Sequence, residues 1–339
     1  MRILLIWASA DWSTADQSLG YQEALTAMGH QVKIFRLVRR LEFWAEALLH
    51  WSEMTKQSGA QLEQVCREAS DWALIEAAYF RPDLVLITSG MGFHPNAAAM
   101  LRAHGYKVGV ALSECPYDDA KHEDFIQAVD YAFANDLWSV ERLAKVNPNT
   151  WYVPTAYSET RHFPQEPEGR ADVLFVGTGF GERERMLRAV DWSGIDLQLF
   201  GFWGWENETI GELQPLIREP ITNDEAARRY CGAKVCLNFY RDGAGYSLNP
   251  RAYELAACGA FQLAQDSVLE AHLLFGDSIA YFDDAASLGA QVRYWLLPEN
   301  AERRRNMAEE ALRLVQGHSY RQRVESILRH VRAEVVAMR

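Results

Sequence analysis

The sequence lacks the features that mark several classes of protein. It has only five cysteines in 339 residues. Their odd number and their spacing argue against both a disulfide framework and a zinc site. No apolar run reaches the roughly 20 residues that a membrane-spanning helix needs. The first residues also lack the basic, apolar and small-residue order of a signal peptide. We therefore expect a soluble cytoplasmic protein with reduced thiols and no membrane span.

Positive charge is also scarce. Lysine and arginine number 34 against 46 aspartates and glutamates, which gives a net charge of −12. Affinity for nucleic acid comes largely from cations that neutralise phosphates, so this balance argues against a broad nucleic-acid surface and leaves a local basic cleft open. No phosphate-binding P-loop, G-x-S-x-G motif or cluster of metal-ligating residues occurs. We therefore expect chemistry that is independent of a metal ion.

The sequence does contain two successive patterns of alternating strands and helices. Residues 3–7 are a continuous apolar run typical of a buried parallel strand, further strands are expected at 31–35, 84–87 and 107–112, and helical patterns separate them. Residues 154–171 hold three prolines and a glycine among charged residues and are the expected linker. The pattern restarts at 173–176. We predict an α/β fold of two Rossmann-like, doubly wound domains, at 1–155 and 170–318.

One short helix after residue 249 combines several signals. Asn249 can cap its first turn, Pro250 fits the position that needs no N–H, and Gly259 can end it. Arg251 and Glu254 lie three residues apart and so share a face near the free amides of the helix start. This pattern predicts an anion-binding site. An ordinary packing helix with a surface ion pair explains it equally well.

A glycine-rich turn follows the first strand of the second domain. Gly177 and Gly179 lie between a buried strand and a helix that contains Arg183, an arrangement that lets amides approach a phosphate. The spacing differs from the dinucleotide fingerprint G-x-G-x-x-G, which argues against an NAD site. A tight turn with solvated arginines is the plainer interpretation. The aromatic run 200–205 is a candidate for stacking a base or sugar, with core packing as the alternative.

Two loops of the first domain contain candidate catalytic residues. His94 follows a strand end, where open α/β sheets place functional groups, and Glu114 and Asp118 lie in the next such loop. A carboxylate there is able to accept a proton from an acceptor hydroxyl. The alternatives are a structural histidine for His94 and a helix cap for Asp118.

Four stretches together resemble a known family, and they lie at 112–119, 176–183, 247–263 and 317–323. They resemble glycosyltransferases of the GT-B fold, specifically the CgeB-like, or spore-maturation-protein-like, group. The segment around Glu114 is similar to an E-S-P-Y pattern of actinobacterial and phage relatives. The resemblance implies two Rossmann-like domains facing a cleft, a nucleotide-sugar donor held by the second domain, and a final helix, here 319–339, that crosses back to the first.

The resemblance also implies roles for individual residues. Glu254 matches a carboxylate that accepts hydrogen bonds from the donor ribose. Many retaining relatives have a glutamate eight positions earlier, where this chain has Tyr246, so the retaining outcome and the sugar stay open. The glycine-rich loop 242–245 is an alternative contact for the sugar. The expected donor-binding residues are Gly177, Gly179, Arg183, Tyr246, Ser247, Asn249, Arg251 and Glu254.

The resemblance implies transfer of a sugar from a nucleoside diphosphate, with a UDP-sugar expected, to a hydroxyl of a protein, glycan or small molecule. Two alternatives stay open. One is a non-catalytic nucleotide-binding or sugar-binding protein on the same scaffold, which Tyr246 favours. The other is a nucleotide-sugar epimerase. The net charge of −12 argues against DNA as the acceptor.

Overall fold

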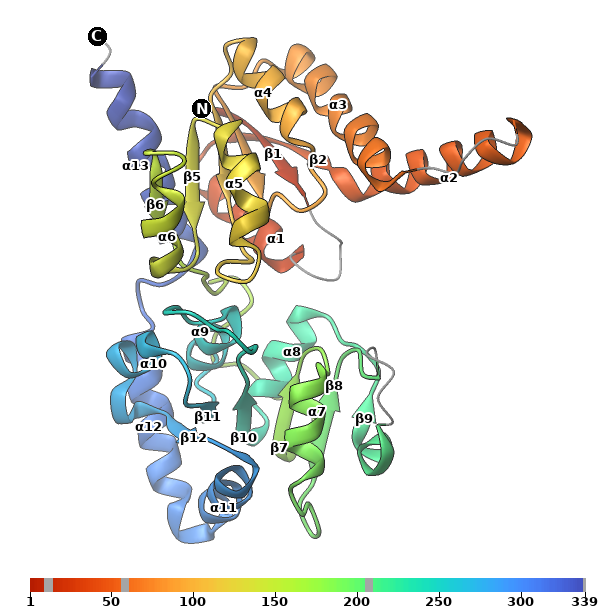
Figure 1. Ribbon diagram of the computed structural model, residues 1–339. Coiled ribbons are helices and arrows are strands. Elements are labelled where there is room, and N and C mark those ends of the chain that lie inside the picture. The colour runs from red at the N-terminus through yellow and green to blue at the C-terminus, as the bar shows by residue number, and fades with distance from the viewer. Residues whose placement is uncertain (9–14, 56–60, 205–209, 338–339) are drawn as a thin grey trace. The chain divides into compact units, whose positions relative to one another are not determined.

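The computed structural model describes residues 1–8, 15–55, 61–204 and 210–337. It divides into two compact units, one of residues 1–155 and 320–339 and one of residues 156–319. Each unit is built on a six-stranded parallel sheet with helices on its faces (Figure 1). Among the described helices, none is both long and apolar enough to cross a membrane.

The N-terminal unit has the strand order β2-β1-β3-β4-β5-β6. Its central strands β1 and β3 are almost wholly buried, because helices cover both faces of a parallel sheet. Its elements are β1 (Arg2–Trp7), α1 (Ala15–Ala27), β2 (Gln31–Arg36), α2 (Leu37–Thr55), α3 (Leu62–Phe80), β3 (Leu84–Thr88), α4 (Pro95–Ala103), β4 (Val108–Ala111), α5 (Asp119–Gln127), β5 (Tyr131–Ala134), α6 (Leu137–Leu143), β6 (Thr150–Tyr152) and α13 (Tyr320–Ala337).

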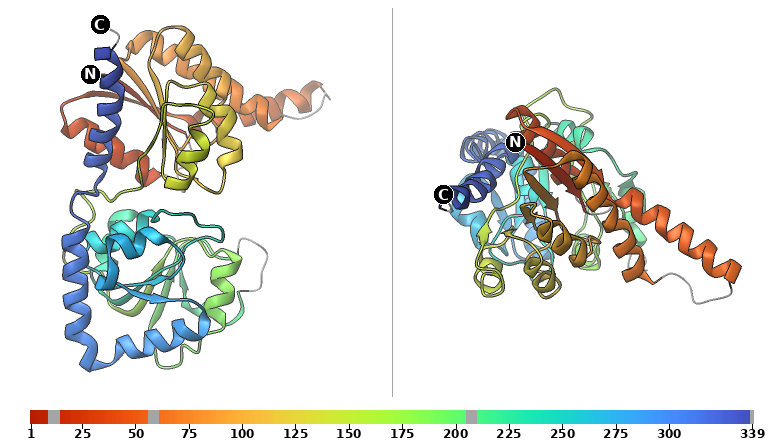
Figure 2. Two further views of the ribbon diagram at one scale, coloured as in Figure 1. Left: turned by 60° about the vertical axis from the view of Figure 1, so that its left-hand side comes forward. Right: turned by 90° about the horizontal axis from the view of Figure 1, so that it is seen from above.

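The last helix, α13, packs on the N-terminal unit beside α1 (Figure 2). The Tyr320 ring meets the Tyr21 ring edge-on at 5.4 Å and lies against Gly20, where a side chain would collide with it. Arg323 donates hydrogen bonds to the carbonyls of Pro154 and Thr155 at 3.0 and 3.1 Å. These contacts hold α13 in the sequence-distant unit 1–155.

The C-terminal unit has the strand order β12-β11-β10-β7-β8-β9, so its first strand, β7, is central. Its elements are β7 (Ala171–Val176), α7 (Gly181–Arg188), β8 (Leu197–Phe200), η1 (Gly211–Leu216), β9 (Ile217–Arg218), α8 (Asn223–Tyr230), β10 (Ala233–Asn238), α9 (Pro250–Ala257), β11 (Gln262–Gln265), α10 (Leu269–Leu274), η2 (Gly276–Ser278), β12 (Ala280–Phe282), α11 (Ala285–Leu296), η3 (Pro298–Asn300) and α12 (Ala301–Leu314). The loops after β7 and β10 are therefore neighbours, because adjacent parallel strands end at the same sheet edge.

Candidate functional site

The predicted glycine turn forms at the carboxyl end of β7. The Gly177 amide donates a hydrogen bond to the Phe200 carbonyl and the Gly179 amide to the Phe202 carbonyl, both at 2.8 Å. Gly177 has φ +154°, and a Cβ atom there would collide with the Arg251 guanidinium. A Cβ atom on Gly179 would run into the Trp203 ring. Glycine is therefore required at both positions for this close packing.

Arg251 lies in the first turn of α9 and packs directly on that glycine turn. Its guanidinium lies 4.8 Å from the centre of the Phe175 ring. Its Nε is buried and has no hydrogen-bond partner among the described residues. A buried cationic donor without a partner is costly, since it has lost water without gaining an acceptor. An anion beside Arg251 would satisfy it.

Two more arginines lie at the same sheet edge, around the ring of Phe180. Arg183 is buried, its Nη1 donates to the Thr178 carbonyl at 2.9 Å, and its guanidinium lies 4.8 Å from the centre of the Phe180 ring. The exposed Arg241 lies 5.2 Å from the centre of the same ring. Arg183 thus stabilises the turn from within, while Arg241 adds positive charge at the surface.

Asn249 positions α9 through every polar atom of its side chain. Its Oδ1 accepts the Ala252 N–H at 3.0 Å, which caps the helix as predicted. Its Nδ2 donates to Asn238 Oδ1 at 2.8 Å and to the Phe239 carbonyl at 3.0 Å. These bonds fasten the start of α9 to the end of β10. The described contacts therefore give Asn249 a positioning role.

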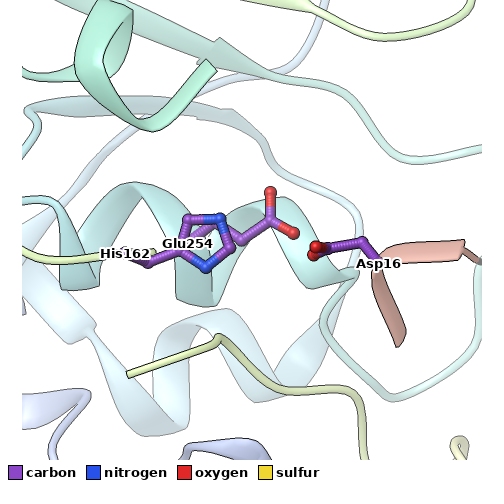
Figure 3. Close-up of side chains that lie close together, drawn as sticks. All are labelled: Asp16, His162 and Glu254. Atoms are coloured by element: carbon purple, nitrogen blue, oxygen red, sulfur yellow. The ribbon is translucent and has the colours of Figure 1, made fainter. Parts of the chain in front are cut away.

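Glu254 lies one turn further along α9 and is half-buried. Figure 3 shows its carboxylate beside the ring of His162, and a ring nitrogen of His162 lies within 4.8 Å of a carboxylate oxygen. His162 is buried, and its Nδ1 accepts the Ser158 N–H at 3.0 Å. The third labelled residue, Asp16, belongs to α1 in the other unit.

The pKa of Tyr230, at the end of α8, depends on the charges of Glu254 and Arg251. Burial raises the pKa of the Tyr230 phenol well above its usual range. The negative charge of Glu254 raises this pKa further, and the positive charge of Arg251 opposes it. The carboxylate and the guanidinium therefore act on one buried phenol from the same helix.

The loop with Tyr246 and Ser247 is fastened by Glu270 of α10. The Glu270 carboxylate accepts the Leu248 N–H at 2.8 Å and the Tyr253 hydroxyl at 3.3 Å. The Glu270 N–H in turn donates to the Tyr246 carbonyl at 3.1 Å. Tyr246 and Ser247 are half-buried in this loop just before α9.

The predicted aromatic loop after β8 has two different parts. Trp203 packs against the Phe175 ring at 5.8 Å and belongs to the core of the unit, whereas Phe202 is 53% exposed. Trp205 lies outside the described residues. The core-packing interpretation thus holds for Trp203.

In the N-terminal unit, His94 caps a helix. Its Nδ1 accepts the Asn96 N–H at the start of α4 at 3.2 Å, and its backbone N–H donates to Ser70 Oγ at 2.9 Å. Its Nε2 lies 3.9 Å from Glu63 Oε1. These contacts are those of a structural histidine that caps a helix, which was the alternative to a catalytic role for His94.

Glu114 and Asp118 lie in the loop between β4 and α5, next in the sheet to the loop that holds His94. Glu114 is half-buried, and its carbonyl accepts the Asp118 N–H at 3.0 Å. Asp118 makes no side-chain cap and pairs instead with Lys121 at 2.7 Å. The predicted cap is therefore wrong for Asp118.

The structure thus brings together Gly177, Gly179, Arg183, Asn249, Arg251 and Glu254 in one unit. Sequence reasoning missed Arg241 and His162. Arg241 follows the end of β10, a position that the strand pattern could have flagged. His162 lies in the irregular segment predicted as a linker, where no periodic signal points to it.

Comparisons with known proteins agree with this architecture. Residues 183–329 match the family model described as glycosyl transferase-like. No curated protein matches the sequence. Among solved structures, a sucrose-phosphate synthase from Thermosynechococcus elongatus is similar with a TM-score of 0.70 and 14% identity, over 98% of this chain and 100% of that one.

Two further structures share the fold. A putative UDP-N-acetylglucosamine 2-epimerase from Listeria monocytogenes gives a TM-score of 0.65 at 12% identity, over 99% of this chain and 97% of that one. An α-glucosyltransferase in complex with UDP and a 13-mer DNA containing an HMU base gives 0.60 at 12% identity, over 94% and 96%. The predicted α/β fold with two Rossmann-like domains, GT-B, is confirmed.

Proposed function

We propose that this chain, whose residues 183–329 match the glycosyl transferase-like family model, transfers a sugar from a nucleoside-diphosphate donor to a hydroxyl acceptor. The observation that carries the proposal is Arg251. Its guanidinium packs on the glycine turn, with a buried Nε that has no partner among the described residues. A diphosphate supplies the acceptor oxygens that this donor lacks, and arginine binds such oxygens in a bidentate manner.

The same geometry supports roles for the residues around Arg251. Glu254, one turn along α9, is proposed to accept hydrogen bonds from the donor ribose. Arg183 and Asn249 are proposed to hold the turn and the helix in place, since their polar atoms bind backbone groups of those elements. Tyr246 and Ser247 lie in the loop before α9 and are proposed to contact the donor, with a UDP-sugar expected.

The chemical step that these residues favour is departure of the nucleoside diphosphate. Negative charge develops on the leaving phosphate as the glycosidic bond breaks, and fixed cations that meet this charge lower the barrier. We assign that role to Arg251, with Arg241 adding charge at the surface, and expect no need for a metal ion. Glu114 stays our proposed base for the acceptor hydroxyl, which belongs to a protein, glycan or small molecule.

A panel of donors tests this proposal. In a first assay, the melting temperature of the purified protein is measured with UDP-, GDP-, TDP- and CMP-sugars. In a second assay, the release of free nucleotide from each donor is measured with and without EDTA. We expect one donor to raise the melting temperature by several degrees, since a ligand at about 100 times its Kd stabilises by about 2.7 kcal/mol. We also expect slow hydrolysis that EDTA leaves unchanged. No shift and no release with any donor would reject the proposal.

Two other functions give different results in the same assay. A non-catalytic binding protein, which Tyr246 at the usual glutamate position favours, would show the thermal shift without nucleotide release. An epimerase, the class to which the structure from Listeria monocytogenes is ascribed, would isomerise the sugar without an acceptor. A DNA acceptor is disfavoured by the net charge of −12.

A further inference from the structure

Two cysteines lie at the ends of adjacent helices in the C-terminal unit, and Cys258 is at the opposite end of α9 from Arg251. Cys231 follows the last residue of α8, and Cys258 follows the last residue of α9. Both are free thiols. The Sγ of Cys231 lies 3.5 Å from the Cys258 carbonyl oxygen and 3.8 Å from that of Phe163. The two side chains are therefore close neighbours although 26 residues separate them.

These thiols line an open cavity of about 280 Å³ at the surface. Gln165 lies on one side, and Arg305 and Glu309 of α12 lie on the other. Cys231 is half-buried, whereas Cys258 is buried. The volume is close to the lower end of small-molecule pockets, which begins at roughly 300 Å³. A small reagent can thus reach Cys231, and it reaches Cys258 less easily.

Hydrogen bonding within the pair shifts the pKa values of the two thiols in opposite directions. Hydrogen bonding with the Cys258 side chain, and with the backbone at Gln165 and Cys231, favours the Cys231 thiolate. Together these hydrogen bonds outweigh burial and lower the pKa of Cys231 to about 7. The same hydrogen bonding between the side chains raises the pKa of Cys258 well above its usual range. Near neutral pH Cys231, the more accessible of the two sulfurs, is therefore the one that deprotonates first.

The other three cysteines have no such arrangement. Burial raises the pKa of Cys66, Cys115 and Cys236. Cys66 is the half-buried one of the three and lies on α3 in the N-terminal unit. It therefore serves as an internal reference for a half-buried cysteine whose raised pKa keeps it protonated at neutral pH.

We propose that Cys231 is a site of thiol–disulfide exchange with low-molecular-weight disulfides and that Cys258 is its resolving thiol. The Cys231 thiolate attacks one sulfur of the small disulfide, forms a mixed disulfide and releases one small thiolate. Cys258 then loses its proton to solvent, and its sulfur attacks Cys231, which forms the Cys231–Cys258 bond and releases the second small thiolate. The small disulfide is reduced to two thiols as the pair is oxidised.

The test uses the full chain and 2-hydroxyethyl disulfide, followed by peptide mass mapping. In the wild type we expect a Cys231–Cys258 cross-link and two released thiols per chain. Cys258→Ser should stop at a mixed disulfide on Cys231, and Cys231→Ser should give neither product. Cys66→Ser is the matched control and should behave as the wild type. Circular dichroism checks that each variant is folded.

Alkylation rates measured on the wild-type chain test the proposal even if a serine variant does not fold. Alkylation by iodoacetamide should label Cys231 at least about tenfold faster than Cys66 at neutral pH, with a rate midpoint near pH 7. Equal labelling of Cys66 and Cys231 would overturn the proposal. So would a Cys258→Ser chain that accumulates no adduct, or a wild type that stays at the mixed disulfide.

Discussion

The Arg251 guanidinium lies where a side chain on Gly177 would otherwise be. Arg251 lies at the start of α9, the helix that follows β10, and Gly177 lies in the turn after β7. The strands β7 and β10 pair with each other in the centre of the C-terminal sheet. The glycine and the arginine therefore depend on each other. The amides of Gly177 and Gly179 are already bonded to the Phe200 and Phe202 carbonyls, so what the turn offers an anion is the room that it leaves for the cation.

Gly177→Ala should disturb both the turn and Arg251. The added methyl group must displace the guanidinium, and such overpacking costs about 1–3 kcal/mol. We expect a lower melting temperature and weaker binding of nucleoside diphosphate. Gly194→Ala is the matched control, because Gly194 also has positive φ, +75°, but open space around its Cα. An equal loss of diphosphate affinity in both variants would contradict the role of Gly177.

Glu254→Ala should remove recognition of the ribose hydroxyls. Wild-type protein should bind UDP more tightly than 2′,3′-dideoxy-UDP, because hydrogen bonds to a charged group contribute about 1.5–3 kcal/mol. In Glu254→Ala the two ligands should bind with nearly equal affinity. Isothermal titration calorimetry of the four combinations measures this coupling. If the variant kept the wild-type preference for UDP, the carboxylate would not contact the ribose.

Glu114→Gln should reduce turnover by at least about 100-fold while donor affinity is kept, since general bases contribute about 10²–10⁴-fold. The amide keeps the shape of the side chain and loses only its basicity. The neighbouring Asp118→Asn is the control, because Asp118 pairs with Lys121. Wild-type turnover in Glu114→Gln would remove it as the proposed base.

His94 should matter mainly for stability, since its Nδ1 caps α4. His94→Ala should lower the free energy of unfolding by about 1 kcal/mol, and His94→Asn should restore it, because asparagine is a good N-cap. Urea unfolding and turnover are measured on both variants. An inactive but fully stable His94→Asn chain would instead support the catalytic role that the sequence suggested.

The strand and helix pattern predicted the two-sheet fold because buried parallel strands leave a strong apolar signal, as in β1 and β3. It also predicted the cap by Asn249, but not the packing of Arg251 on the glycine turn. It did not predict the bonds from Asn249 to β10 or the position of His162 beside Glu254. Those contacts join segments far apart in the chain, and no local propensity encodes them.

Calorimetric titration of UDP and UMP into wild-type protein and Arg251→Ala tests the central claim most directly. Arg293→Ala is the control, since Arg293 forms an exposed ion pair with Asp191 in the same unit. The account predicts that wild type and Arg293→Ala prefer UDP over UMP by tenfold or more, about 1.4 kcal/mol. Arg251→Ala should lose most of that preference. An unchanged preference for UDP in Arg251→Ala would contradict a diphosphate site at this arginine.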